Sequence, residues 1–301
     1  MIKIRNLPLT NFEKSFFSQW GEDGILLHIF SLIDVNPENS FLIDVGAWDG
    51  EYLSNTKHFI DMGWGAILIE SNVDRARNAS SKFSENLKVS VLNVKIDNTQ
   101  RLSSLIPNTL SEKKCALLSI DIDSDDLLVF ESIDDLRPYI VVIEFNPTIP
   151  NQIYFKNPVG SRVGNSARAI MQIANTFGYG LAHATQTNLI LLKSELFEPT
   201  GIEELTLETA LDDSLTVRGV FAGYDGSLHI IGLTEVEFPW HGLSRKIESL
   251  ALPKALQKHM DEYNFSQRLL YRYFWFRQYW KNALLRRLDI RNTNFTKDGN
   301  Q

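Results

Sequence analysis

The sequence predicts an α/β fold: a seven-stranded, mostly parallel sheet with helices on both faces, followed by a C-terminal extension of mixed character. Three observations lead to this prediction. Short apolar runs alternate with helix-compatible segments along residues 1–193. Several of these runs end directly on an acidic residue, as strands do when they lead into a ligand-binding edge. The last two runs are joined by a short polar turn, which favours a closing antiparallel hairpin.

The strands and helices of the first part follow one another in a regular order. The predicted strands are residues 41–44, 66–69, 89–94, 116–120, 140–143, 179–184 and 189–192. The predicted helices are residues 11–33, 57–61, 72–86, 127–136 and 166–177. Most strands are therefore separated by a helix, and parallel strands need such a crossover.

Composition divides the chain into residues 1–193, the sheet domain with a helical lead-in, and residues 194–301, an extension of short strands and amphipathic basic-aromatic helices. The extension ends in residues 265–288, where aromatic and basic side chains are interleaved. Such a stretch can pack on its own domain or on a second copy in a homodimer, or it can contact an anionic membrane surface or a polysaccharide as a peripheral helix. All four outcomes stay open at this point.

Charge and cysteine content exclude several classes of function. The net charge of −7 argues against nucleic-acid binding, which needs a basic footprint. Cys115 is the only cysteine, so an intrachain disulfide and a cysteine-based metal cluster are excluded. No uninterrupted apolar window reaches the length of a transmembrane helix, and no secretory leader is evident, so we expect a cytoplasmic protein.

Residues 41–70 predict a nucleoside pocket. The strand ends at Asp44 and is followed by a turn containing Gly46, Ala47 and Gly50. Glu70 ends the next strand about 20 residues after the turn, where a carboxylate can accept hydrogen bonds from both ribose hydroxyls. The third glycine of a dinucleotide fingerprint and the phosphate-binding P-loop are both missing, so a pyrophosphate cradle is poorly supported. An acid beside the turn suits a cationic amino-acid group, such as that of S-adenosylmethionine.

The motifs IDVGAWDG, LSNT, GWGAILIE, LSIDIDSDD and VVIEFNP carry a family resemblance. Together they resemble the class I S-adenosylmethionine-dependent methyltransferases, in particular FkbM-type and related enzymes that modify sugars or natural products. The resemblance covers residues 18–193 and implies a Rossmann-like sheet and a small-molecule or glycan acceptor. It also implies that Asp44, Gly46 and Gly50 surround the methionine part, that Glu70 binds the ribose and that Asp97 lies near the adenine. Ala47, Ser71 and Asp121 are the other residues that we expect to bind the cofactor.

Acidic residues that follow the fourth and fifth strands suggest assistance to an acceptor hydroxyl. Asp121, Glu144 and Asn146 resemble in placement the oxygen ligands of divalent-metal-dependent O-methyltransferases, and hard oxygen ligands suit Mg²⁺. Without a metal, Asp121 or Asp123 would serve as the general base, or these acids would bind the ammonium group of the cofactor.

Two other functions remain open. The IDIDSDD segment matches the paired acids that hold a metal and a diphosphate in nucleotide-sugar glycosyltransferases, although short aspartate runs are common. In that case the glycine turn and Glu70 would have no role. A methyltransferase-like domain kept as a non-catalytic binding scaffold would show the same sequence pattern.

Two further segments have a functional and a structural interpretation. The SQWGEDG segment, residues 18–24, either brings polar side chains to the pocket or is a solvated helix start. The loop at residues 148–165 is a lid, a substrate-binding segment or a disordered connection.

Overall fold

The computed structural model describes residues 8–97, 100–107, 110, 112–133, 136–212, 219–224, 227–232, 235–238, 242–246 and 252–287. The chain divides into two compact units, Met1–Asp212 and Asp213–Gln301. Each unit is described by itself.

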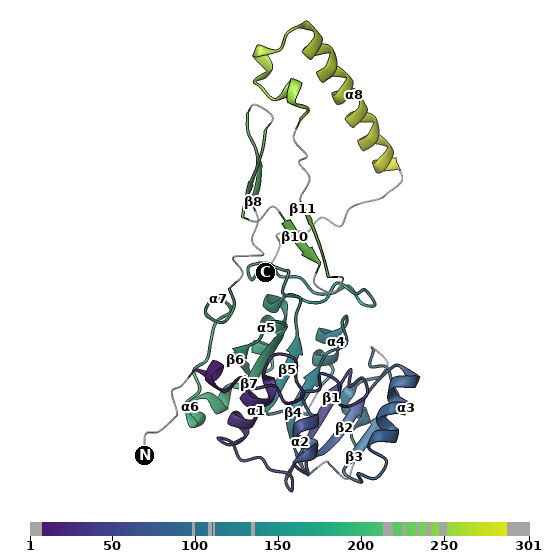
Figure 1. Ribbon diagram of the computed structural model, residues 1–301, viewed down its shortest axis with the longest axis vertical. Coiled ribbons are helices and arrows are strands. Elements are labelled where there is room, and N and C mark those ends of the chain that lie inside the picture. The colour runs from purple at the N-terminus through teal and green to yellow at the C-terminus, as the bar shows by residue number, and fades with distance from the viewer. Residues whose placement is uncertain are drawn as a thin grey trace. The chain divides into compact units, whose positions relative to one another are not determined.

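The first unit is built on a seven-stranded sheet with the order β3-β2-β1-β4-β5-β7-β6 (Figure 1). All neighbouring pairs are parallel except those made by β7, which runs antiparallel to both β5 and β6. The strands are β1 Ser40–Val45, β2 Gly65–Ile69, β3 Val89–Leu92, β4 Lys114–Ile120, β5 Ile140–Glu144, β6 Tyr179–Ala184 and β7 Asn188–Lys193. The predicted seven-stranded, mostly parallel sheet and its closing hairpin are confirmed, and the architecture is Rossmann-like.

Helices cover both faces of this sheet, because successive strand residues point to opposite sides. Ile43 packs in the apolar cluster that includes Phe130 and Ile170, whereas Leu42 packs in the cluster that includes Ile25 and Phe59. The helices of the first unit are α1 Glu22–Phe30, α2 Lys57–Asp61, α3 Val73–Lys82, α4 Asp126–Glu131, α5 Ala167–Thr176, α6 Phe197–Thr200 and α7 Leu207–Ala210.

The helix predicted for residues 11–33 is shorter than expected, since α1 begins only at Glu22. Gly21 adopts a left-handed φ of 94°, which interrupts a helix. One oxygen of Asp23 accepts the backbone N–H groups of Phe16, Phe17 and Ser18 at 2.7–2.8 Å, and these bonds hold the preceding segment in a non-helical turn.

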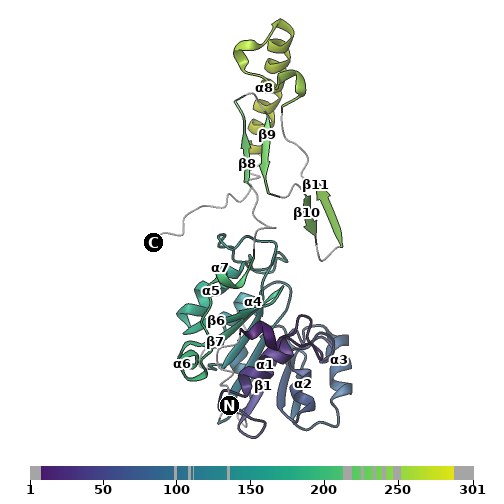
Figure 2. The same cartoon turned by 60° about the vertical axis from the view of Figure 1, so that its left-hand side comes forward.

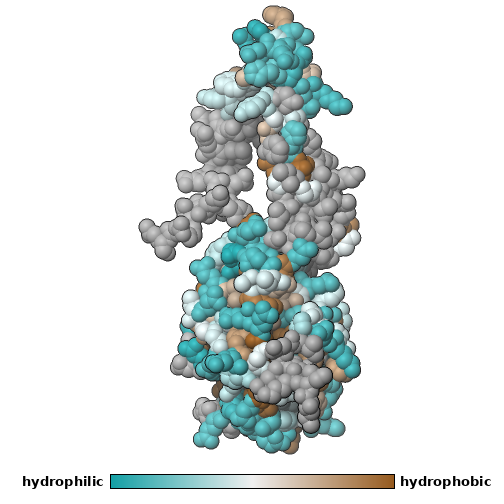
Figure 3. Space-filling model, turned by 90° about the vertical axis from the view of Figure 1, so that its left-hand side faces the viewer, coloured by the Kyte–Doolittle hydropathy of each residue, from teal (hydrophilic) through white to brown (hydrophobic). Residues whose placement is uncertain are grey.

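The segment after the last strand of the sheet belongs to the first unit. Phe197 and Leu207 are buried in its two apolar clusters, and the Leu205 N–H donates to the Leu181 carbonyl at 2.8 Å. On the face shown in Figure 3, apolar residues of this unit appear as small patches between hydrophilic ones, as is normal for a protein surface.

In its described residues, the second unit contains two separate hairpins and one long helix (Figure 2). The hairpins pair β8 Gly219–Ala222 with β9 Leu228–Ile231, and β10 Glu235–Phe238 with β11 Leu243–Lys246. The helix is α8, Phe265–Arg287. Among the described residues, no helix is both long and apolar enough to cross a bilayer.

Candidate active site

The glycine turn after β1 is wedged between the ends of β2 and β4. The N–H groups of Gly46 and Ala47 both donate to the Ile69 carbonyl, at 2.9 and 3.1 Å. Gly46 has a φ of 89°, and a Cβ atom there would lie 1.7 Å from the backbone oxygen of Asp121. Only glycine fits at this position, because a side chain would collide with rigid backbone. The turn therefore abuts the acidic end of β4.

The second glycine of the turn is also explained by close packing. Gly50 has a φ of 76°, and a Cβ atom there would lie 2.5 Å from the ring of Phe83 and 2.9 Å from Leu68. Both glycines predicted to surround the cofactor are thus required by the fold, whatever else they contact.

Asp44 lies beneath this turn and is buried. Its Oδ2 atom accepts hydrogen bonds from the hydroxyls of Ser54 and Thr56, at 3.1 and 2.8 Å. Burial raises the pKa of Asp44 above its ordinary value despite these bonds. Asn55, between the two hydroxyl residues, donates from Nδ2 to the Ser119 hydroxyl at 3.1 Å, while its buried Oδ1 has no partner in the described part of the chain. Buried acceptors normally have a hydrogen-bond partner, so Asn55 Oδ1 is a candidate to accept a hydrogen bond from a ligand bound near Asp44.

Glu70 is buried at the end of β2, where it ties the turn to the next loop. Its Oε2 accepts the N–H of Trp48 at 3.0 Å, and its Oε1 accepts the N–H of Asn72 at 2.7 Å. The Asn93 side chain donates to the carbonyls of Glu70 and Ser71, at 2.8 and 3.1 Å. A carboxylate offers about four acceptor positions, so Glu70 retains capacity for ribose hydroxyls.

Asp97, predicted to lie near the adenine, follows β3 after four intervening residues. It is half-buried, and its Oδ1 accepts the Gln100 N–H at 3.1 Å within a turn. No hydrogen bond in the described residues links it to Glu70 or to the glycine turn, so its role at the adenine stays a prediction.

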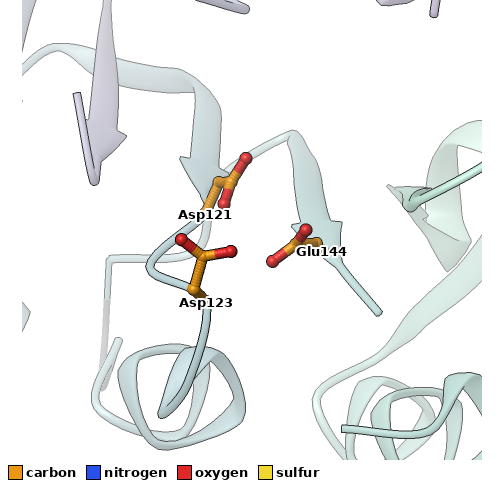
Figure 4. A group of neighbouring side chains, drawn as sticks. All are labelled: Asp121, Asp123 and Glu144. Carbon is orange, nitrogen blue, oxygen red and sulfur yellow. The ribbon is translucent and has the colours of Figure 1, made fainter. Parts of the chain in front are cut away.

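Three carboxylates meet where β4 and β5 end. Asp121, Asp123 and Glu144, which we call the acid cluster, each place an oxygen within 4.8 Å of the other two (Figure 4). Asp121 and Asp123 are exposed and Glu144 is half-buried. Asp123 adopts a left-handed φ of 57°, an uncommon state that aspartate tolerates better than most residues. Buried Asp126 holds this loop by accepting the N–H groups of Ile122 and Ser124, at 2.8 and 3.0 Å.

The acid cluster carries more negative charge than its surroundings neutralise. Loss of hydration raises the pKa of Glu144, and the charges of Asp121, Asp126 and Asp123 raise it further. Loss of hydration also raises the pKa of Asp121, with contributions from Asp126, Asp123 and Asp44. Both carboxyl groups therefore bind a proton more readily than ordinary carboxyl groups do. Burial raises the pKa of Asp126 to about 6. Such a group of acids is suited to accept a cation or a proton.

Asn146, the third predicted metal ligand, is engaged elsewhere. Its Oδ1 accepts the N–H and the hydroxyl of Thr148, at 2.9 and 2.6 Å, and its Nδ2 donates to the Val163 carbonyl at 2.7 Å. The structure brings Asp123 together with Asp121 and Glu144, and a ligand role for Asn146 stays a prediction.

The long loop at residues 148–165 is fastened to the acidic loop after β4. Asp125 accepts hydrogen bonds from Asn157 Nδ2 at 3.0 Å and from the Gly160 N–H at 3.1 Å. Asn165 Nδ2 donates to the Ser124 carbonyl at 3.3 Å. These contacts fix the loop as a wall beside the acid cluster, which fits a substrate-binding segment better than a free lid.

The SQWGEDG segment also reaches this edge of the sheet. Oε1 of the fully buried Glu22 accepts hydrogen bonds from Thr185 and from Asn188 Nδ2, at 2.8 and 2.9 Å. Asn188 lies directly opposite Glu144 in the β5–β7 ladder, and its buried Oδ1 has no partner in the described residues. The sequence reasoning did not identify Asn55 and Asn188 as site residues. Asn188 is the polar first residue of an otherwise apolar strand, which was the available signal, whereas Asn55 lies in a polar loop that offers none.

The residues of the candidate site fit both groups that the sequence predicts there, Mg²⁺ and S-adenosylmethionine. Three hard oxygen donors with uncompensated charge suit Mg²⁺. Buried acceptors without partners, next to the glycine turn and opposite Glu144, suit a ligand that carries donors such as an ammonium or hydroxyl group. Two surface hollows, formed by residues of α2, α3 and positions 83–91, include none of the predicted site residues.

Comparisons with protein-family models and with curated sequences find no match. Similar solved structures include a SAM-dependent methyltransferase from Aquifex aeolicus, with 12% identity, a TM-score of 0.39, and coverage of 62% of this chain and 96% of that one. Magnesium protoporphyrin IX methyltransferase from Synechocystis PCC 6803 with bound SAM is 16% identical, with a TM-score of 0.37 and coverage of 57% and 78%. Mitomycin 7-O-methyltransferase is 12% identical, with a TM-score of 0.33 and coverage of 56% and 52%. At these values, the functional conclusion depends on the topology and residues of the chain itself.

Proposed function

We propose that the protein is an S-adenosylmethionine-dependent methyltransferase that acts on a hydroxyl of a sugar, glycan or natural product. The observation that carries this proposal is the contact between Gly46 and the backbone of Asp121, where the position of a Cβ atom would lie 1.7 Å from the Asp121 oxygen. A donor held by the glycine turn and Glu70 would therefore sit beside the acid cluster, where an acceptor hydroxyl would be activated.

The proposed cofactor contacts follow the positions of the described acids. Glu70 would bind the ribose hydroxyls, and Asp44 with Asn55 would accept from the ammonium group. Asp97 would lie toward the adenine, and Ser71 would also contact the cofactor. When bound, S-adenosylmethionine supplies an electrophilic methyl group on a sulfonium.

The chain's own residues would orient the acceptor and remove its proton. The acceptor oxygen forms a bond to the methyl carbon while the carbon–sulfur bond breaks, leaving a neutral thioether and a methyl ether. Without a metal, the hydroxyl proton would pass to Asp121 or Asp123 of the acid cluster. Alternatively, Asp121, Asp123 and Glu144 would hold Mg²⁺, which would lower the pKa of the acceptor hydroxyl.

The acceptor and the cellular address are further parts of the proposal. Residues 148–165 are fastened to the acidic loop through Asp125, so they would contact an acceptor that is bound at the acid cluster. We propose that this acceptor is a small molecule or a glycan. A cytoplasmic location stays a prediction.

A ligand-dependent thermal shift tests the proposal. Saturating S-adenosylmethionine or S-adenosylhomocysteine should raise the melting temperature, because a ligand that binds only the folded state stabilises it. Glu70→Gln should reduce this shift, whereas Glu85→Gln, an exposed carboxylate of the same unit, should leave it unchanged.

Other outcomes would replace the proposal. A shift with a nucleoside-diphosphate sugar and Mn²⁺, but with neither methyl-donor ligand, would favour the glycosyltransferase, since Asp121 and Asp123 lie in one cluster. Binding of the methyl donor without turnover on any acceptor would favour the scaffold.

A further inference from the structure

Helix α8, Phe265–Arg287, combines aromatic and basic residues to an unusual degree. Its sequence contains no aspartate or glutamate. The basic residues are Arg268, Arg272, Arg277, Lys281, Arg286 and Arg287. The aromatic residues are Phe265, Tyr271, Tyr273, Phe274, Trp275, Phe276, Tyr279 and Trp280.

Large apolar side chains of α8 are exposed on one side of the helix, which we call the aromatic stripe. Its members and their exposed fractions are Phe265 79%, Leu269 51%, Tyr273 58%, Trp275 58%, Phe276 58%, Tyr279 56% and Trp280 56%. Most follow one another at intervals of three or four, which places them on one broad face of an α-helix. Monomeric proteins rarely expose so many large apolar residues together, so we expect another surface to cover the stripe.

The start of α8 contacts the preceding segment of its own unit. Gln267 donates to the Ala255 carbonyl at 2.7 Å, and Arg268 donates to the Tyr263 carbonyl at 3.0 Å. The rings of Tyr263 and half-buried Tyr271 lie 6.0 Å apart. The preceding segment, residues 252–264, thus anchors the start of the helix and leaves the stripe facing outward.

We propose that the aromatic stripe of α8 lies flat on an anionic lipid surface. Tryptophan and tyrosine favour the boundary between headgroups and acyl chains, where the ring is in apolar surroundings and the polar atom remains hydrated. A helix with basic residues and no acidic residue is complementary to anionic headgroups. Because α8 is not apolar enough to span a bilayer, a helix lying in the interface plane is the arrangement that its composition fits.

Arg272 distinguishes this partner from a second copy of the chain. It is exposed and one helical turn from both Leu269 and Phe276, so its guanidinium lies within the stripe. A protein partner covering the stripe would bury this charge, and charged residues are depleted from the cores of protein interfaces. At a lipid surface, the same guanidinium reaches headgroup phosphates while its alkyl stem stays among apolar groups.

Vesicle cosedimentation of the full-length protein tests the proposal. We expect binding to phosphatidylcholine vesicles that contain about one third phosphatidylglycerol, with weak binding to phosphatidylcholine alone and release at high salt. Each basic residue near an anionic surface contributes about fivefold to partitioning, so Arg272→Glu should weaken binding by tenfold or more.

The double variant Phe276→Ser, Trp280→Ser should also lose binding. The matched control is Tyr224→Ser, which removes a fully exposed aromatic residue of the same unit and should bind as wild type. Arg272→Glu keeps the apolar area of the stripe, so it tests the proposal even if the double variant fails to fold.

Equal binding with and without the anionic lipid, or no binding to either vesicle, would overturn the proposal. A concentration-dependent dimer that Phe276→Ser, Trp280→Ser dissociates, without vesicle binding, would assign the stripe to a second copy instead. The test is independent of methyl transfer, because it measures partitioning rather than turnover or cofactor binding.

Discussion

Replacing Asp121 with asparagine removes one negative charge from the acid cluster while keeping the size of the side chain. The cluster places its carboxylate oxygens within 4.8 Å of one another. At 4.8 Å, two unit charges repel by about 3.5 kcal/mol at an effective dielectric constant of about 20, and by about 0.9 kcal/mol in bulk water. Because Asp121 retains solvent contact, we expect Asp121→Asn to raise the free energy of unfolding by about 1–3 kcal/mol in the presence of a chelator.

Thermal unfolding at pH 8 measures this effect. For a unit of this size, each kcal/mol corresponds to roughly 2–4 °C in melting temperature. Mg²⁺ should stabilise the wild type but should have little effect on Asp121→Asn, since a ligand is missing. The gain should shrink at pH 5, because the raised pKa values of the cluster let protons neutralise it. The control Glu112→Gln should change neither quantity.

A destabilised Asp121→Asn variant, or equal stabilisation of both proteins by Mg²⁺, would refute this reasoning. The first result would show that the cluster is not strained by its charges. The second would show that the ion binds elsewhere.

Three further predictions concern the first unit. Gly46→Ala should lower the free energy of unfolding by about 2–5 kcal/mol in a urea titration, because the new Cβ atom would lie 1.7 Å from the Asp121 backbone oxygen and the φ of this residue is 89°. An unchanged midpoint of urea unfolding would contradict the close contact. Asn55→Ala should change the free energy of unfolding by less than about 1 kcal/mol but weaken S-adenosylhomocysteine binding about tenfold in a fluorescence titration, because the buried Asn55 Oδ1 has no protein partner among the described residues and would accept a hydrogen bond from the ligand. Unchanged affinity would show that Asn55 does not contact the ligand. Burial lowers the pKa of His183, beside Glu13, so the folded state loses stability as the pH falls below 6.5. In melting curves recorded over this pH range, His183→Gln should reduce the loss of stability. The same dependence of melting temperature on pH in the variant would assign the loss to other groups.

The sequence was most informative for features that depend on residues close together along the chain, namely the buried strands and the glycine turn. Apolar runs such as Leu42 and Ile43 predict buried strands, because both faces of a central parallel sheet are covered by helices. The glycine turn could be predicted as well, since few other residues adopt the positive φ of Gly46 and Gly50.

The finer arrangement of the site depends on contacts between distant segments. The sequence offered Asn146 as a metal ligand and Asp123 as a general base. In the structure, the Asn146 side chain donates to the Val163 carbonyl, and Asp123 joins the cluster through a left-handed turn. The start of α1 was also misjudged, because the Asp23 carboxylate captures three backbone N–H groups that a helix would otherwise have used. Such choices are set by tertiary partners, which periodicity does not report.

Calorimetric titration of the protein with S-adenosylhomocysteine tests the central claim most directly. We predict one binding site per chain, with an affinity that Glu70→Gln reduces by at least tenfold because the carboxylate no longer accepts from the ribose. Absence of binding, or the same affinity in wild type and a folded Glu70→Gln variant, would contradict the assignment of the glycine turn and Glu70 to a methyl-donor pocket.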